Sequence, residues 1–175
     1  MPADPPDGIV LARNRDLEGR RWQIWVRRGL MLVPLAIVVA ALLNVFGQTR
    51  VSSTSRSAVA TLGVVAPEHL RGGLLFEARF DVHARSDIAD ARLVLDEGWL
   101  EGMSINTIEP SPISQTSRDG RLQLDLGHMA AGSVYRLYMQ FQVLPTNVGS
   151  RSADVTLWDS TTRILSLDHT ITVLP

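Results

Sequence analysis

The chain has 175 residues, a length that suits one domain with appended segments better than two domains. It contains no cysteine, which excludes disulfide bonds, cysteine-ligated zinc and thiol catalysis. Residues 1–50 hold seven arginines and four acids, whereas residues 51–175 hold ten arginines and fourteen acids. Because phosphate binding needs a basic face, the acidic second part argues against a nucleic-acid partner.

The first 28 residues are predicted to form an arginine-rich tail. Residues 1–16 begin with PADPPDG and mix both signs of charge, a composition that cannot bury a core and that predicts disorder. Residues 17–28, LEGRRWQIWVRR, have no cleanly apolar helical face. We interpret them as a collar beside a membrane.

Residues 29–47 are predicted to cross a membrane as one α-helix. The stretch from Gly29 to Gly47, GLMLVPLAIVVAALLNVFG, has no charge over nineteen positions. As a helix it would be about 28 Å long, close to the roughly 30 Å hydrocarbon core of a bilayer. No other stretch of the sequence has a continuous apolar run of similar length.

The flanks of this span predict its direction. Six arginines precede it, and only Arg50 and Arg56 follow it before residue 60. Cytoplasmic flanks collect arginine and lysine, so we expect a single-pass protein of the cell membrane with a cytoplasmic N-terminus and an extracytoplasmic C-terminal domain. Indole rings favour the headgroup region. The residues expected at the membrane interface are Arg20, Arg21, Trp22, Trp25, Arg27 and Arg28.

Two alternatives to a retained anchor stay open. Ala58-Val59-Ala60 matches the A-x-A cleavage pattern of a signal peptide, but cleavage normally follows closely behind the apolar run, and this pattern does not. The arginine pairs at 20–21 and 27–28 match a twin-arginine export signal, although such pairs are common before any span of this orientation. Retention is the favoured interpretation.

After the span the sequence pattern changes to that of β-strands. Residues 48–58, QTRVSSTSRSA, are polar and are predicted to be a tether. In Leu74–Ala84 apolar residues alternate with charged ones, which gives one buried and one solvated face. The other segments that show this alternation, or a weaker form of it, are Val59–Val65, Ala91–Leu95, Ser104–Ile108, Arg121–Leu126, Ser133–Leu144, Ala153–Trp158 and Leu165–Val173.

Short strands separated by glycine-rich turns predict the fold class. We expect an all-β chain: an antiparallel Ig-like β-sandwich of seven or eight strands at residues 59–175, preceded by one transmembrane α-helix.

Three glycine-punctuated stretches carry a resemblance to a known family. The first runs from Asp96 to Ile105 and is followed by Pro110; the second is spaced as G-x-h-x-h-x-h-G-x-h-x-x-G, where h is apolar. The residues of the second and third stretches are Gly120, Leu122, Leu124, Leu126, Gly127, Met129 and Gly132, then Phe141, Val143, Pro145 and Gly149. The pattern resembles the conserved-repeat Ig-like modules of bacterial cell-surface proteins. That resemblance implies one structural or adhesive module over residues 59–175, with no active-site residues.

No constellation in the sequence requires an enzyme, a metal or a cofactor. The four histidines have no metal-site spacing, and there is no G-x-S-x-G and no phosphate-binding loop. Acids between residues 87 and 101 could in principle bind calcium or act in a hydrolase, but they do not follow a calcium-loop pattern. We expect no catalytic, cofactor-binding or metal-binding residues.

The outer domain contains two tryptophans, Trp99 and Trp158. Trp99 lies between glycines, where its indole either contacts a partner or covers the end of the core, and the two interpretations are equally favoured. Trp158 ends a predicted strand and is expected in the core.

These features predict a membrane-anchored, non-catalytic, extracytoplasmic interaction module, such as an accessory subunit of a membrane or cell-envelope complex. Its expected partners are the lipid bilayer and another membrane or envelope protein. Two alternatives stay open: a carbohydrate or cell-wall binding domain that uses Trp99, and a calcium-dependent module or hydrolase that uses the acids at 87–101.

Overall fold

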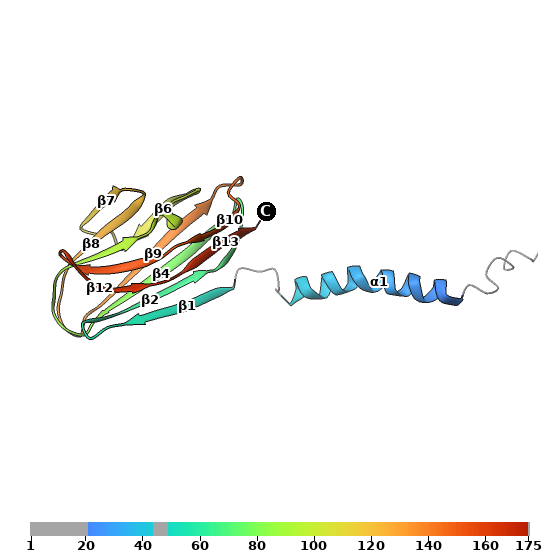
Figure 1. Ribbon diagram of the computed structural model, residues 1–175, viewed down its shortest axis with the longest axis horizontal. Coiled ribbons are helices and arrows are strands. Elements are labelled where there is room, and N and C mark those ends of the chain that lie inside the picture. Colours follow the sequence, from blue (N-terminus) through green and yellow to red (C-terminus); the bar gives the residue numbers. More distant parts are fainter. Residues whose placement is uncertain (1–20, 44–48, 175) are drawn as a thin grey trace, which may run out of the picture. The chain divides into compact units, whose positions relative to one another are not determined.

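The computed structural model describes residues 21–43 and 49–174. The chain divides into two compact units, with the boundary between Gly47 and Gln48. The first unit contains a helix and the second contains strands (Figure 1). Each unit is described separately below, and the predicted disorder of residues 1–16 lies outside the described residues.

The helix α1 spans Arg21–Leu42, so it begins eight residues before the predicted start of the membrane span. Leucine, alanine, methionine and arginine favour helix, and Pro34 is accommodated within it. The stretch Trp22–Leu42 is long and apolar enough to cross a membrane, and no part of it is buried. The predicted end of the span falls among residues 44–48, which the structure does not describe.

The second unit is a β-sandwich made of two five-stranded antiparallel sheets (Figure 1). The first sheet has the order β1 (Arg50–Arg56), β2 (Ala60–Pro67), β4 (Leu75–Ala84), β9 (Val134–Val143), β6 (Met103–Glu109). The second sheet has the order β12 (Thr162–Leu167), β11 (Val155–Asp159), β5 (Ile88–Leu95), β8 (Arg121–Met129), β7 (Ser114–Arg118). The fold class predicted from the alternation is therefore confirmed.

A third, three-stranded sheet is formed by short strands. Its order is β10 (Gly149–Ser152), β13 (Thr170–Leu174), β3 (His69–Arg71), and the pair β13–β3 is parallel. The last predicted alternating face, Leu165–Val173, is thus divided between two sheets, because the chain leaves β12 at Leu167 and re-enters a strand at Thr170.

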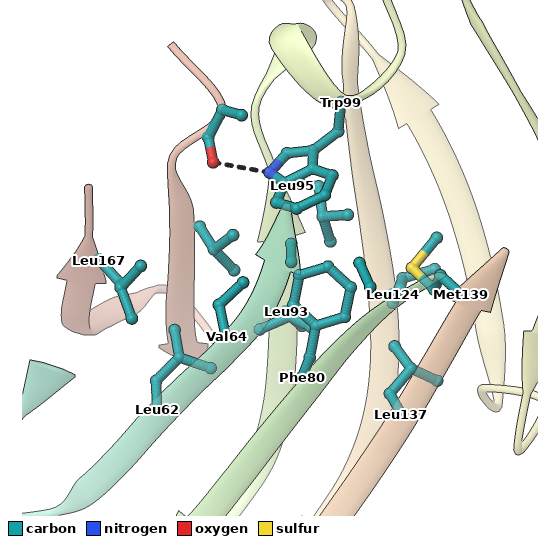
Figure 2. Close-up of a cluster of buried hydrophobic side chains, with 14 of the residues drawn as sticks. Leu62, Val64, Phe80, Leu93, Leu95, Trp99, Leu124, Leu137, Met139 and Leu167 are labelled. Atoms are coloured by element: carbon teal, nitrogen blue, oxygen red, sulfur yellow. Dashed lines mark hydrogen bonds between the residues drawn. The ribbon is translucent and has the colours of Figure 1, made fainter. Parts of the chain in front are cut away.

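The inward-facing residues of the two large sheets form one hydrophobic core. In β4 the side chains of Phe76, Ala78, Phe80 and Val82 are at most 5% exposed, and their neighbours along the strand are more exposed. β9, β5 and β8 contribute leucine, methionine and phenylalanine side chains to the same core. Figure 2 shows side chains from these strands meeting between the sheets. The alternation in the sequence therefore identified the buried faces correctly.

Residues 50–56 differ from the prediction. The sequence predicts a tether at 48–58, but residues 50–56 form β1, which pairs with β2 over its whole length from Arg50↔Pro67 to Arg56↔Thr61. Its inward positions are Val51, Ser53 and Ser55, which are only half-buried. An edge strand needs few apolar side chains, because it covers the margin of the core and is held by backbone hydrogen bonds. The tether interpretation is therefore wrong for these residues.

The described part of the chain has more strands than the seven or eight predicted. The additional strands are the polar edge strand β7 and the short strands β3 and β10, together with β1. Every residue of β7, SQTSR, is exposed. Such strands carry no apolar alternation, so periodicity does not reveal them.

Candidate functional site

Trp99 lies inside the sandwich, at one end of the core. It ends the short 3-10 helix η2 (Glu97–Trp99) and is 0% exposed. Its Nε1 donates a hydrogen bond of 2.7 Å to the backbone oxygen of Ala153 (Figure 2). The ring and its single donor are thus both satisfied within the domain. The prediction that Trp99 contacts a partner is therefore wrong, whereas the alternative that it covers the end of the core agrees with the structure.

Aromatic rings surround Trp99. Its ring centroid lies 5.2 Å from that of Phe80 in an edge-to-face arrangement and 5.5 Å from that of Phe141. Gly98 explains why the loop can enter this deeply, because a Cβ there would overlap the backbone oxygen of Ser152. The glycine before Trp99 thus permits a close approach of two chain segments, which seats the indole.

His169 stacks on Trp99 at a centroid distance of 5.6 Å. It is 4% exposed, and its Nε2 is buried with no hydrogen-bond partner among the described residues. Burial lowers the pKa of the imidazole below its ordinary value, and the charges of Glu68 and Asp154 oppose this shift only in part. His169 is therefore a neutral packing residue near pH 7.

Four of the five acids at 87–101 form separate ion pairs. Asp87 lies 3.0 Å from His128 Nε2, Asp96 lies 2.6 Å from Arg121 Nε, and Asp90 contacts Arg92. Glu101 lies 3.6 Å from Arg151. Within the described ranges, 21–43 and 49–174, no three His, Cys, Asp or Glu side chains are grouped so that they could hold a metal ion. Four of these acids are thus distributed over separate ion pairs, and none of the ion pairs between described residues includes Glu97.

Of the residues predicted at the membrane interface, Arg21, Trp22, Trp25, Arg27 and Arg28 lie in the first eight residues of α1. Trp22 and Trp25 are 63% and 70% exposed, and the guanidinium carbon of Arg28 lies 5.6 Å from the centre of the Trp25 ring. Arg20 and the side chain of Arg21 lie outside the described residues. Exposed indoles and guanidinium groups suit a headgroup region, so the interface role remains a prediction.

Trp158 was expected in the core, but it lies on the outer face of the second sheet. Val155 and Leu157 of β11 are buried, whereas Thr156 and Trp158 are half-buried on the other face. Trp158 Nε1 donates a 2.9 Å hydrogen bond to the hydroxyl oxygen of Thr156. The alternation along Ala153–Trp158 predicts this position. Side chains two residues apart in a strand point to the same face, so Trp158 lies on the face of Thr156 and not on that of Leu157.

Trp158 lines a cleft of about 660 Å³ on this outer face. Its neighbours in register are Arg92 on β5 and Arg163 on β12. The cleft is otherwise lined mainly by hydroxyl, amide and charged side chains. A concave polar surface with one aromatic ring is a candidate binding site that sequence reasoning did not find.

A second groove, of about 830 Å³, lies beside β6 and β7, the last strands of the two large sheets. Its lining includes the apolar side chains of Leu100, Ile105, Ile108 and Ile113. Ile113 is 74% exposed, which is high for so large an apolar side chain. In the large sheets, β6 pairs only with β9 and β7 only with β8, so each strand presents one unpaired edge.

These features define the class of protein as an antiparallel β-sandwich module preceded by an apolar helix that could span a membrane. No family model matches the chain, and no curated protein matches it. The resemblance to conserved-repeat surface modules therefore rests on the sequence pattern alone, although the β-sandwich that it implied is present.

Solved structures give distant matches to the fold. A non-cellulosomal cohesin from the archaeon Archaeoglobus fulgidus is 10% identical, with a TM-score of 0.39, over 61% of this chain and 86% of that one. CaCohA2 from Clostridium acetobutylicum is 12% identical, with a TM-score of 0.46, over 67% of this chain and 92% of that one. AvmM, which catalyses macrocyclization in alchivemycin A biosynthesis, is 7% identical, with a TM-score of 0.42, over 74% of this chain and 90% of that one. Likenesses this distant carry no inference about what this chain binds or catalyses.

Proposed function

We propose that this chain is a single-pass membrane protein whose β-sandwich is a non-catalytic, extracytoplasmic module that binds another membrane or envelope protein. The observation that carries the proposal is the apolar surface of α1. Leu30, Leu35 and Leu42 are 72%, 55% and 81% exposed. From Gly29 to Leu42 the helix carries no charged or amide side chain, and a helix that is apolar on all sides is stable in a lipid bilayer, where these side chains leave water.

Retention of the helix is supported by the position of the A-x-A pattern. Ala58 and Val59 lie in the turn between β1 and β2, and Ala60 is the first residue of β2. Cleavage after Ala60 would remove β1, which pairs with β2 from Thr61 to Pro67. An uncleaved helix keeps the first sheet complete.

The groove beside β6 and β7 is the surface that best suits a protein partner. Interface centres are formed by apolar side chains, and Ile105, Ile108 and Ile113 supply them here. An unpaired strand edge beside these side chains also offers backbone donors and acceptors to an extended segment of a partner. The partner of this groove is therefore expected to present an apolar segment in extended conformation.

Site-specific crosslinking tests this function. A photo-reactive amino acid is placed at Ile113 in the full chain, expressed in its membrane, and crosslinked products are identified by mass spectrometry. The matched control is Val134, a 56% exposed apolar residue of β9 that does not line the groove. We expect one reproducible membrane or envelope protein at Ile113 and not at Val134. Equal products at both positions, or none at Ile113, would contradict the proposal.

A further inference from the structure

The outer face of the second sheet carries features that the proposed protein interface does not use. Arg163, Trp158 and Arg92 form a row across three adjacent strands, β12, β11 and β5. All three side chains line the same 660 Å³ cleft. The groove beside β6 and β7 shares none of these residues. This row is therefore a separate surface.

A β-bulge brings Arg163 into the row. The register between β11 and β12 shifts between Leu157 and Trp158, so that Leu157 pairs with Leu165 but Trp158 pairs with Arg163. By simple alternation Arg163 would share the inward face of the buried Leu165. The bulge instead places Arg163 beside the indole, on the cleft side.

The indole of Trp158 is held by a hydrogen bond and lines the cleft. Its only donor is used in the hydrogen bond to Thr156, which fixes the ring along its own strand. Among the described residues, the only cation placed over an aromatic ring is Arg28 over Trp25. Neither Arg92 nor Arg163 therefore makes a cation–π contact with Trp158, and the half-buried indole lines the cleft, where it can contact a ligand.

Charge also distinguishes this cleft from the rest of the domain. Four arginines and three acids line it, whereas residues 51–175 as a whole contain ten arginines and fourteen acids. Arg92 and Arg121 are held by Asp90 and Asp96, but none of the ion pairs between described residues involves Arg163. An exposed guanidinium beside a half-buried indole suits an anionic group on the ligand.

The lining selects the class of ligand. A protein interface would need several apolar anchors, but the aromatic contact here is one ring among Thr156, Ser160, Thr161 and Ser166. A sugar ring has an apolar C–H face that stacks on an indole and hydroxyl groups that bond such side chains. From this chemistry we propose that the Trp158 cleft binds an acidic saccharide, with one sugar ring on Trp158 and its carboxylate or phosphate group on Arg163.

Isothermal titration calorimetry on the full chain in neutral detergent micelles tests the proposal. The probes are a hexamer of galacturonic acid, glucose 6-phosphate and, as the neutral comparison, maltohexaose. We expect one or both acidic probes to bind and the neutral hexamer to bind at least about tenfold more weakly. Binding of the galacturonic acid hexamer would identify the anionic group that the cleft recognises as a carboxylate. Binding of glucose 6-phosphate would identify it as a phosphate.

Substitutions locate the site. Trp158→Ala should weaken binding at least about fivefold, and Trp158→Phe, which keeps a ring, should retain most of it. Arg163→Gln should weaken binding about tenfold. The matched controls are Tyr138→Ala, on the first sheet, and Arg85→Gln, after β4; neither residue lines the cleft, and both are exposed. These two should bind like the original chain.

Several outcomes would overturn the inference. They are the absence of binding by both acidic probes at 10 mM, equal binding of maltohexaose, and equal loss in Arg85→Gln and Arg163→Gln. A poly-glutamate peptide that binds as tightly, and does so unchanged in Trp158→Ala, would equally reject a saccharide site. None of these outcomes bears on the crosslinking result at Ile113, so the two proposals fail separately.

Discussion

At the scale of single residues, the two tryptophans of the sandwich show how position along a strand or loop decides burial. Trp158 occupies an outward-facing position of its strand β11, and Trp99 is buried at the end of the short helix η2. The parity of Trp158 can be derived from Val155 and Leu157 in the sequence. The burial of Trp99 cannot, because it depends on the close approach of Gly98 to Ser152, which belongs to a distant segment. Local pattern determines the first case, and long-range packing determines the second.

His169 makes stability depend on pH. The unfolded chain protonates this histidine with the ordinary pKa of 6.5, whereas burial lowers the pKa in the folded domain. Below pH 6.5 the unfolded state therefore binds more protons, and the free energy of unfolding should fall as pH decreases. The fall should be at most about 1.4 kcal/mol per pH unit and should end below the folded pKa. From about one pH unit above 6.5 upward, this residue should contribute almost no pH dependence.

His169→Phe tests this dependence, because phenylalanine keeps a ring against Trp99 and does not titrate. Denaturant unfolding of the full chain in detergent is followed between pH 7.5 and 5.5. We expect a flatter profile in the variant than in the original chain. The acids near His169, Glu68 and Asp154, are present in both proteins and cancel in the comparison. A profile as steep as that of the original chain would show that another group is responsible.

At the scale of elements, β1 is the strand that distinguishes the observed sandwich from the predicted one. The backbone N–H of Ser57 donates to the oxygen of Ala60 at the hairpin end. Because N–H groups alternate in direction along a strand, those of Ser55 and Ser53 also point to β2, and that of Thr54 points outward. β1 is therefore held mainly by backbone bonds and not by apolar side chains.

A pair of proline substitutions measures this contribution. Ser53→Pro removes a ladder donor and should lower the free energy of unfolding by about 2–3 kcal/mol. Thr54→Pro removes an outward N–H and should cost less than about 1 kcal/mol. Denaturant unfolding of both variants gives the difference. Equal, small effects would indicate that residues 50–56 act only as a tether.

At the scale of the whole molecule, the orientation of the membrane helix is a prediction from the arginine flank. The chain contains no cysteine, so a single introduced cysteine reports its own location. Ser86→Cys, at an exposed position after β4, should react with a membrane-impermeant maleimide in intact cells. Ala12→Cys, in the N-terminal tail, should react only after the cells are opened. The reverse pattern would place the sandwich in the cytoplasm, and labelling of both in intact cells would argue against a span.

The sequence by itself determined the apolar helix and the inward faces of β4, β5, β8 and β9, since each follows from local composition or a period of two. Tertiary structure decided the polar edge strands β1 and β7, the burial of Trp99 and the row of Arg163, Trp158 and Arg92. The physical reason is the same in each case. Edge strands are held by backbone bonds to a neighbouring strand, and the cleft is assembled by register and a bulge between strands. Neither arrangement produces a periodic pattern of apolar residues within one segment of the sequence.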